Sequence, residues 1–261
     1  MSVILGISGG FIHRIGSPAA CLVINGKLEF AQEEERFNRI KNSGGLMPTY
    51  AIKQALKFKK IDIRDVDYVA FHSNYPKLIN KIESYFVFNF GYSPKIKFVD
   101  HHSSHAYSAY YPSGFKKANI LTLDYSGNGI STTISLGIEN KIKRFKEIKK
   151  PNSLGIFYGL ITQILGFEID NDEYKVMGLA SYGKPKYNLN NILNVDKDIF
   201  RLNNKILNIA ELDKKKSLML TRQEPFYSDY LLKQLKLKRR KEKNIHSKKK
   251  KDLASSAQNQ L

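Results

Sequence analysis

Short apolar runs separated by turn signals set the pattern at the start of the chain. The run VILGIS stops at Gly9-Gly10, a second run, AACLVI, follows, and the pair Asn25-Gly26 leads into a third stretch that becomes charged. Asn-Gly between two apolar runs is a strong signal for a two-residue hairpin turn. The opening therefore predicts three strands, the first two joined through a glycine-rich turn.

The same order returns about 118 residues later. The run NILTLDYSGNG ends in a glycine-rich turn, ISTTISLGI follows, and Glu139-Asn140 separates it from KIKRFKEI. A helical stretch comes after each copy, PTYAIKQALKFKK in the first and LGIFYGLITQILG in the second. Two copies of one supersecondary plan predict an α/β fold with two duplicated lobes, each a mixed sheet flanked by helices.

The repeat also predicts where the parts of the chain divide. Residues 1–116 would form the first lobe, 117–230 the beginning of a second lobe, and 231–261 a basic linker with the start of a helix. The 261 residues, 42% of them hydrophobic, are enough for a sizeable core. Neither a membrane-length apolar run nor a leader is evident, so we expect a cytoplasmic protein.

The charge of the chain is strongly positive, but much of it is local. The formal net charge is +19, and residues 231–251 hold nine lysines and two arginines against one glutamate, a net charge of +10. A localised basic run is typical of a solvated linker or helix face. We therefore do not expect nucleic acid as the partner, although an evenly spread charge of this size would favour one.

The histidine-rich segment VDHHSSHAYSAYYPSGF is the main candidate for chemistry. If a helix begins near Ser103 or just before it, His101 and His105 share one face and can bind one metal ion. Asp124, at the end of a predicted strand, would complete a His-His-Asp set that suits Fe, Mn or Zn better than Ca or Mg. Alternatively, the histidines only cap a helix. We expect His72, at the end of another strand, to be structural.

Glycine-rich turns and one lysine are candidates for binding an anion. Backbone N–H groups in such turns can approach a phosphate closely because no Cβ intervenes. A plain turn and a surface lysine are the alternative interpretations. The candidates are Ser8, Gly9 and Gly10 in the first copy, Ser126, Gly127, Asn128 and Gly129 in the second, and Lys175 and Gly178 in the stretch FEIDNDEYKVMGLASYGKP.

Taken together, these motifs resemble a family, the O-carbamoyltransferases of the nodulation-protein and antibiotic-tailoring type. The resemblance is carried by AACLVINGKL, EEERFNRIK, HHSSHAYSAYYPSGF, LTLDYSGNG and DEYKVMGLASYG, in that order, and covers about residues 3–185. The N-terminal domain of this family is similar to threonylcarbamoyl-tRNA synthesis proteins and, more remotely, to actin and sugar kinases. The resemblance thus implies duplicated actin-like lobes, with the second lobe incomplete in this sequence.

The resemblance also implies cofactors and a reaction. An iron-type divalent metal would be held by His101, His105 and Asp124, with a further aspartate ligand from later family sequence. Carbamoyl adenylate, made from carbamoyl phosphate and ATP in a separate C-terminal domain, would give its carbamoyl group to a hydroxyl of a small-molecule alcohol or sugar. The loop from Asp124 to Gly129 and the stretch from Lys175 to Ala180 would line the nucleotide side.

The catalytic base is the point at which the sequence departs from the family. Family members usually carry His-Asp just before the Ala-Ala run, where this chain has Gly16-Ser17-Pro18. His13 would then have to substitute as the base that takes the hydroxyl proton. Lys41 matches a lysine that the family retains and would hold an anionic or polar group near the substrate.

Three hypotheses follow for the function. First, the chain is the N-terminal portion of a carbamoyltransferase and is inactive alone, and a second chain would supply the C-terminal half. A second-lobe sheet that ended with this portion would leave apolar surface and an open edge. Second, it is a non-catalytic binding protein whose basic tail docks on a polyanion or a partner chain. Third, it is an actin-like sugar or acyl kinase, in which the paired histidines would have no role.

Overall fold

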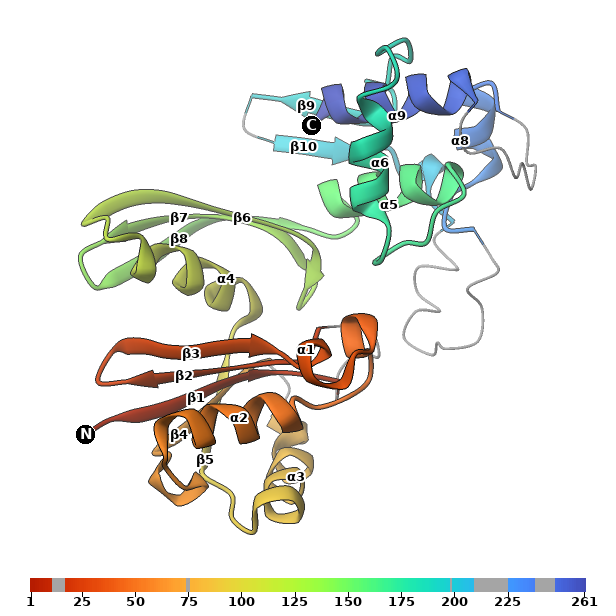
Figure 1. Cartoon of the computed structure of the whole chain (residues 1–261). Helices are drawn as coiled ribbons and strands as arrows, with labels where there is room; N and C mark the ends of the chain where they lie inside the picture. The colour runs from red at the N-terminus through yellow and green to blue at the C-terminus, as the bar shows by residue number, and fades with distance from the viewer. Residues whose placement is uncertain (11–16, 74–75, 198, 209–224, 238–246) are drawn as a thin grey trace. The chain divides into compact units, whose positions relative to one another are not determined.

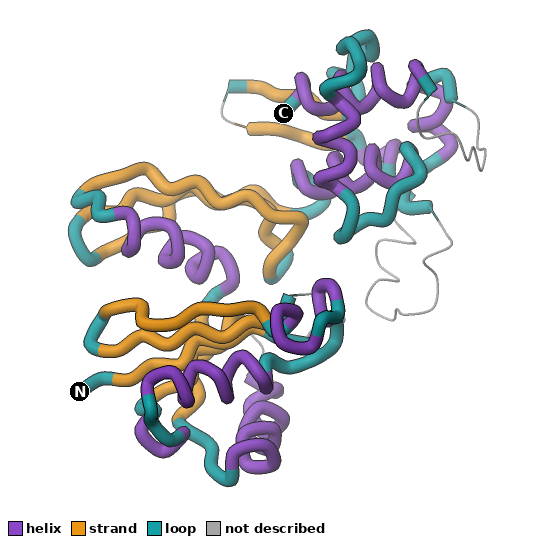
Figure 2. The backbone as a smooth tube through the Cα atoms, in the orientation of Figure 1, coloured by secondary structure: helices purple, strands orange, loops and turns teal. Residues whose placement is uncertain are grey.

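The computed structural model describes the chain except residues 11–16, 74–75, 198, 209–224 and 238–246 (Figures 1 and 2). It divides into two compact units, Met1–Ser108 and Ala109–Leu261. The division falls eight residues before the boundary expected between 116 and 117, inside a continuous helix, α4 (His101–Tyr110). This helix therefore begins in one unit and ends in the other.

Unit 1 is built on a five-stranded mixed sheet in the order β3-β2-β1-β4-β5. Antiparallel pairing joins β1 to β2 and β2 to β3, and parallel pairing joins β1 to β4 and β4 to β5. The predicted hairpin turn is confirmed, because Asn25 and Gly26 both have positive φ, as a two-residue turn of this kind requires. The strands are β1 (Val3–Ser8), β2 (Ala19–Ile24), β3 (Lys27–Glu33), β4 (Tyr68–His72) and β5 (Lys95–Val99).

The core of unit 1 lies between this sheet and two helices. The apolar stripe of α2 (Thr49–Lys59), which includes Ile52, and that of α3 (Ile79–Phe90), which includes Phe86, are buried against Leu5 and Leu22. Alternation along β1 places Leu5 and Ile7 on this covered face. A short helix, α1 (Glu35–Asn38), follows β3, and the buried Glu34 carboxylate accepts the backbone N–H groups of Tyr50 and Ala51 at the start of α2.

Unit 2 repeats the opening plan of unit 1, as the sequence predicts. Its three strands pair antiparallel in the order β6-β7-β8, joined by a glycine-rich turn and then a second tight turn (Figure 1). A helix, α5 (Leu154–Ile164), then follows, as α2 follows the first copy. The strands are β6 (Lys117–Gly127), β7 (Ile130–Ile138) and β8 (Lys141–Lys149), and β9 (Leu193–Asp196) and β10 (Ile199–Leu202) form a separate hairpin.

The second core gathers helices that are distant in sequence. Apolar side chains of α5 and α6 (Glu173–Ala180) pack with those of α8 (Asp229–Gln234) and α9 (Lys248–Gln260). The segment from 231 onward was expected to be a linker with the start of a helix; where it is described, α8 and α9 belong to unit 2. Residues 238–246 of the basic run lie outside the described residues.

One lysine of the basic run is buried rather than solvated. Lys250 is 9% exposed, and its ammonium donates to the carbonyl oxygen of Leu165 at 3.3 Å, at the C-terminal end of α5. A cation at this end of a helix interacts favourably with the partial negative charge of the last carbonyl groups. Within the described part of the chain, no helix combines the length and the apolar character needed to cross a membrane.

The close packing of α9 predicts opposite effects at two glycines. A Cβ at Gly183 would overlap the backbone carbonyl of Lys251, whereas a Cβ at Gly178 meets no described atom within 4 Å. We expect Gly183→Ala to lower the free energy of unfolding by about 1–3 kcal/mol, because backbone cannot move aside cheaply. Gly178→Ala, inside α6, should be neutral or stabilise by up to about 1 kcal/mol through helix propensity. Urea unfolding of both variants measures these changes in the free energy of unfolding. Equal changes in the two variants would contradict the close contact of Gly183 with α9.

A second prediction concerns acid stability. The Asp252 carboxylate accepts the backbone N–H of Lys184 at 2.9 Å and pairs with the Lys186 ammonium at 3.5 Å. The hydrogen bond from Lys184, followed by the Lys186 charge, holds the pKa of Asp252 below its usual value of 3.8. A lowered pKa means that the carboxylate stabilises the fold above its unfolded-state pKa and loses this effect as pH falls through the folded-state pKa.

We therefore expect the stability difference between the parent and Asp252→Asn to be constant near neutral pH and to shrink below about pH 4. Denaturant unfolding at a series of pH values from neutral to acid would show it. A difference that does not change with pH would show that Asp252 does not contribute through its charge.

Candidate metal centre

The helix that carries the paired histidines begins just before Ser103, within the range that the sequence predicts. It starts at His101 because Asp100 caps it: the Asp100 carboxylate accepts the backbone N–H of Ser103 at 2.9 Å and the Ser103 hydroxyl at 2.9 Å. Aspartate is a strongly preferred N-cap and also suits the positive end of the helix dipole. This start places the two histidines on successive turns of one regular helix.

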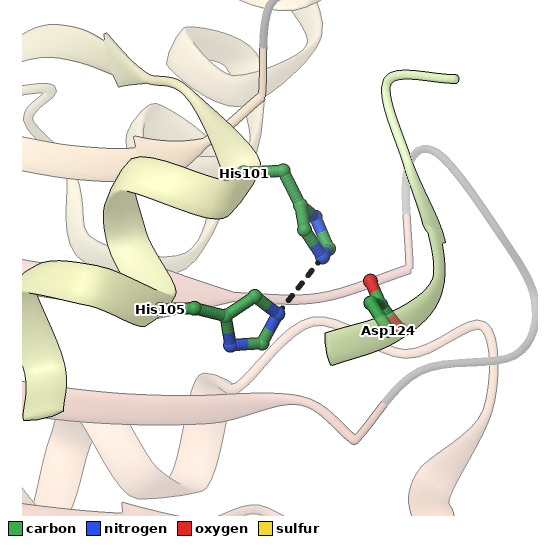
Figure 3. A group of neighbouring side chains, drawn as sticks. All are labelled: His101, His105 and Asp124. Carbon is green, nitrogen blue, oxygen red and sulfur yellow. Dashed lines mark hydrogen bonds between the residues drawn. The ribbon is translucent and has the colours of Figure 1, made fainter. Parts of the chain in front are cut away.

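His101 and His105 turn their imidazoles toward each other. Their Nε2 atoms lie 3.0 Å apart and the ring centroids 4.8 Å apart, with the rings inclined at 70° (Figure 3). Residues four apart on a helix are neighbours on one face, which is the spacing the sequence shows. His72, at the end of β4, lies alongside, with its ring centroid 5.6 Å from that of His101.

The carboxylate of Asp124 lies next to these imidazoles. One ligand atom from each of His101, His105 and Asp124 can be chosen so that all three lie within 4.8 Å of one another (Figure 3). Tyr110, in the last turn of α4, packs on Gly137 of β7, where a Cβ would lie 2.5 Å from its ring. The histidines therefore stand on a helix whose end is fixed to the sheet that contains Asp124.

The position of Asp124 follows from an irregularity in β6. The ladder between β6 and β7 shifts register between Leu123 and Gly127, and the three residues from Asp124 to Ser126 lie opposite the single residue Ser131. Extra residues of this kind bend a strand and redirect its side chains, and they are common beside active sites. The Asp124 side chain accepts the backbone N–H of Tyr125 at 2.6 Å, which fixes the orientation of the carboxylate.

A buried serine holds this irregular segment in place. The Ser153 hydroxyl lies 3.0 Å from the carbonyl oxygen of Asp124 and 2.9 Å from that of Tyr125, and it also accepts the backbone N–H of Ile156 as the N-cap of α5. A Cβ at Gly155 would lie 2.6 Å from the Cα of Tyr125, so the helix start and the strand are in close backbone contact. Ser153 is fully buried.

The donor set fits a divalent transition metal. Two imidazole nitrogens and one carboxylate oxygen are the donors found in non-haem iron sites, and they also suit Mn and Zn. The two Nε2 atoms are 3.0 Å apart and hydrogen-bonded to each other, which is close enough for both to contact one ion at metal–nitrogen distances of about 2.0–2.1 Å.

The glycine-rich segment expected to line a nucleotide forms a tight hairpin turn. Ser126 and Gly127 end β6, and Asn128 and Gly129 connect it to β7 with φ of 55° and 84°. The positive φ values explain the Asn-Gly pair in terms of the turn alone. The first-copy candidates lie at the end of β1, where Gly10 donates its N–H to the carbonyl of Leu46.

The two candidates on α6 have local structural explanations. Lys175 forms an ion pair with Asp172 at 2.7 Å, and the hydrogen bond that the Lys175 ammonium donates to this carboxylate raises the pKa of the lysine. Gly178 was expected to permit a close approach, but a Cβ there meets no described atom within 4 Å; the close approach occurs five residues later, at Gly183.

Of the two candidate catalytic residues, the structure describes only Lys41. His13 lies outside the described residues. Lys41 is exposed and begins a short 3-10 helix (Lys41–Ser43), next to Asn42, whose N–H donates to the Glu35 carboxylate.

Two clefts in unit 1 include none of the described candidate residues in their linings. Their volumes are about 510 Å³ and 610 Å³, and both are bordered by Met47, Tyr85 and Asn89 between the loop before α2 and the helix α3. They are open hollows in the surface, so we assign the chemistry to the donor cluster instead.

The residues that support the cluster were not singled out from the sequence. Asp100 and Ser153 are both N-caps, and each stands just before a predicted helix. The signal was therefore present, because Ser and Asp before an apolar periodic stretch mark a helix start. What the sequence did not indicate is that the Ser153 hydroxyl also holds the strand that contains Asp124.

Solved structures offer distant similarities. Component A of (R)-2-hydroxyglutaryl-CoA dehydratase from Acidaminococcus fermentans is 14% identical, with a TM-score of 0.43 and coverage of 70% of this chain and 60% of that one. MreB5 of Spiroplasma citri is 11% identical, with a TM-score of 0.36 and coverage of 83% and 76%. Both TM-scores are below 0.5, so the mixed α/β class rests on the sheet order given above.

Sequence relatives are more informative. The uncharacterized protein sll1178 of Synechocystis is 33% identical over 251 residues, 80% of this chain and 40% of that protein. The nodulation protein NolNO of Sinorhizobium fredii is 34% identical over 215 residues, 69% of this chain and 31% of that protein. The chain thus spans less than half the length of these relatives. A family model described as carbamoyltransferase N-terminus matches residues 73–259, and the chain belongs to this family.

Proposed function

We propose that this chain provides the metal-binding part of a carbamoyltransferase, in which a carbamoyl group passes from carbamoyl adenylate to the hydroxyl of a small-molecule alcohol or sugar. The family match supports the reaction class. The observation that carries the proposal is the convergence of two imidazoles and one carboxylate, which a kinase or a passive scaffold would not require.

His101, His105 and Asp124 would hold the metal ion, with iron as the expected ion. Bound there, the metal would supply Lewis acidity toward the carbamoyl carbonyl or the adenylate phosphate. Asp100 and Ser153 are positioning residues: the first fixes the start of the histidine helix, and the second fixes the strand at Asp124. Such supporting hydrogen bonds commonly change metal affinity 10–100-fold.

The remaining parts of the reaction need more than these residues. The segment from Ser126 to Gly129 and the start of α6 are our proposal for the nucleotide side of the site. His13 and Lys41 remain the proposed base and anion-holding residue. Carbamoyl adenylate would be formed from carbamoyl phosphate and ATP in sequence that the longer relatives contain beyond the matched part, so we expect a partner polypeptide and no transfer by this chain alone.

The metal proposal makes a direct prediction. The purified chain should bind one equivalent of Fe²⁺, measured by anaerobic calorimetry, and His105→Ala or Asp124→Asn should weaken binding at least about tenfold, because each removes a donor. Ser108→Ala, one turn further along the same helix, is the matched control and should bind as the parent does. No binding by the parent, or equal binding by all variants, would refute the site.

The supporting role of Ser153 can be separated from its role as a cap. Ser153→Ala and Ser228→Ala each remove a serine N-cap, of α5 and α8 respectively, and each should lower stability by about 1 kcal/mol. Only Ser153 is bonded to the strand at Asp124, so only its replacement should also weaken Fe²⁺ binding, by about tenfold or more. Thermal melts and calorimetry on both variants decide the matter, and equal metal affinities would exclude the positioning role.

The reaction itself is tested on an assembled enzyme. The chain is co-expressed with the remainder of sll1178 and assayed with radiolabelled carbamoyl phosphate, ATP, Fe²⁺ and a panel of monosaccharides and polyols. We expect label in an organic acceptor with the complex and none with the isolated chain. His105→Ala in the complex should reduce transfer at least about 100-fold. Transfer by the isolated chain would contradict the proposal, as would an active His105→Ala complex.

A further inference from the structure

His72, the last residue of β4, has no task in the reaction proposed above, although it lies beside a metal ligand. The centroid of its imidazole is 5.6 Å from that of His101, and the two rings are inclined at 60°. Aromatic rings pack favourably in tilted or edge-to-face arrangements at centroid separations of about 4.5–7 Å. The two imidazoles are therefore in packing contact, and both residues belong to unit 1.

The place of His101 on its helix explains why such a contact matters. Side chains of an α-helix point toward its N-terminus and lie over the preceding turn. His105 has such a turn beneath it, the one that begins with His101 (Figure 3). His101 is the first residue of α4, so no earlier turn of the helix supports its ring. The helix fixes the orientation of the second ligand but not that of the first.

The backbone that carries His72 is firmly held. The strand β4 lies inside the sheet of unit 1, between β1 and β5. Phe71, the residue before His72, is fully buried, and its carbonyl oxygen accepts the N–H of Ser73 at 2.9 Å, so that a backbone hydrogen bond closes around His72. A ring attached to this strand end is a fixed support for its neighbour.

The pairing of β4 with β5 places this support at the start of the histidine helix. His72 lies opposite Val99, the last residue of β5, and Asp100 then caps α4 immediately before His101. A slip of the pairing by one residue would turn the side chain of His72 to the other face of the sheet. The strand register and the helix cap together set the contact between the two rings.

We propose that His72 is a positioning residue, whose ring packs on the imidazole of His101 and keeps the Nε2 atom of His101 directed at that of His105, 3.0 Å away. His72 acts through His101 and donates no atom to the metal. Residues that orient metal ligands commonly change metal affinity by about 10–100-fold. This inference rests on the proposed function for the presence of the metal ion.

Anaerobic calorimetry with Fe²⁺ on the full chain tests the role of the ring. His72→Ala should weaken binding about tenfold, because it removes the support. His72→Phe keeps a flat ring and should bind within about threefold of the parent. Tyr68→Ala is the matched control, since it removes an aromatic ring from the same face of β4, four residues away, and should bind as the parent does.

A double-mutant cycle shows whether His72 acts through His101. In the His101→Ala chain, the added replacement His72→Ala should cause no further loss of Fe²⁺ affinity, because the ring that it supports is already absent. In the His105→Ala chain, the same replacement should keep its effect of about tenfold.

A spectrum of the bound metal separates positioning from a general effect on stability. The visible ligand-field bands of bound Co²⁺ report the arrangement of its donors, so they should change in His72→Ala and stay unchanged in His72→Phe and Tyr68→Ala. Thermal melts of the metal-free chains show whether each variant is folded. If His72→Ala does not fold, His72→Leu replaces it, because leucine fills the space without a flat ring and should weaken binding in the same way.

The results distinguish a failure of this inference from a failure of the proposed function. Parent-like Fe²⁺ affinity in His72→Ala, or the same further loss in the His101→Ala chain as in the His105→Ala chain, would overturn the positioning role and leave the metal centre intact. If the parent binds no Fe²⁺, the metal centre is refuted, and the role of His72 is refuted with it.

Discussion

The departure of β6 from its ladder at Asp124 is the constraint on which the candidate site depends. If the strand continued regularly from Leu123, Asp124 would simply follow the alternation of its neighbours. The extra residues let the backbone turn, and the Ser153 hydroxyl then holds the carbonyl groups of Asp124 and Tyr125. The buried Ser153 hydroxyl thereby links the start of α5 to Asp124, the carboxylate of the donor cluster. The same residue should therefore affect both the stability of the fold and the affinity for the metal.

Much of the fold could be predicted because its signals are local. Asn25-Gly26 and the alternating apolar runs of β1 and β2 specify a hairpin without reference to the rest of the chain. The repetition of the plan in β6, β7 and β8 then gave the duplicated architecture. The proximity of His101 to His105 likewise follows from helix geometry alone. That Asp124 joins them depends on a bulge, which the sequence does not reveal.

Residues whose roles depend on distant neighbours are harder to interpret from the sequence. Gly178 was expected to permit close packing, yet the helix α9 meets the chain at Gly183. No local pattern identifies which of two nearby glycines faces Lys251, a residue 68 positions after Gly183. Lys175 was predicted as a charge for an anion, and the sequence did not indicate that Asp172, one turn before it, pairs with its ammonium. In both cases the residue type indicated a kind of interaction, but the sequence did not identify the residue with which it interacts.

The buried ammonium of Lys250 has a consequence for how variation should be distributed in natural versions of this chain. Four consecutive lysines, 248 to 251, look interchangeable, and Lys248 and Lys249 are exposed. Lys250 alone reaches a helix carbonyl. Substitution by other hydrophilic residues should therefore be tolerated at Lys248 and Lys249 but not at Lys250. Within this run of four lysines, purifying selection should act on Lys250, and a position-by-position comparison of many natural versions would reveal it.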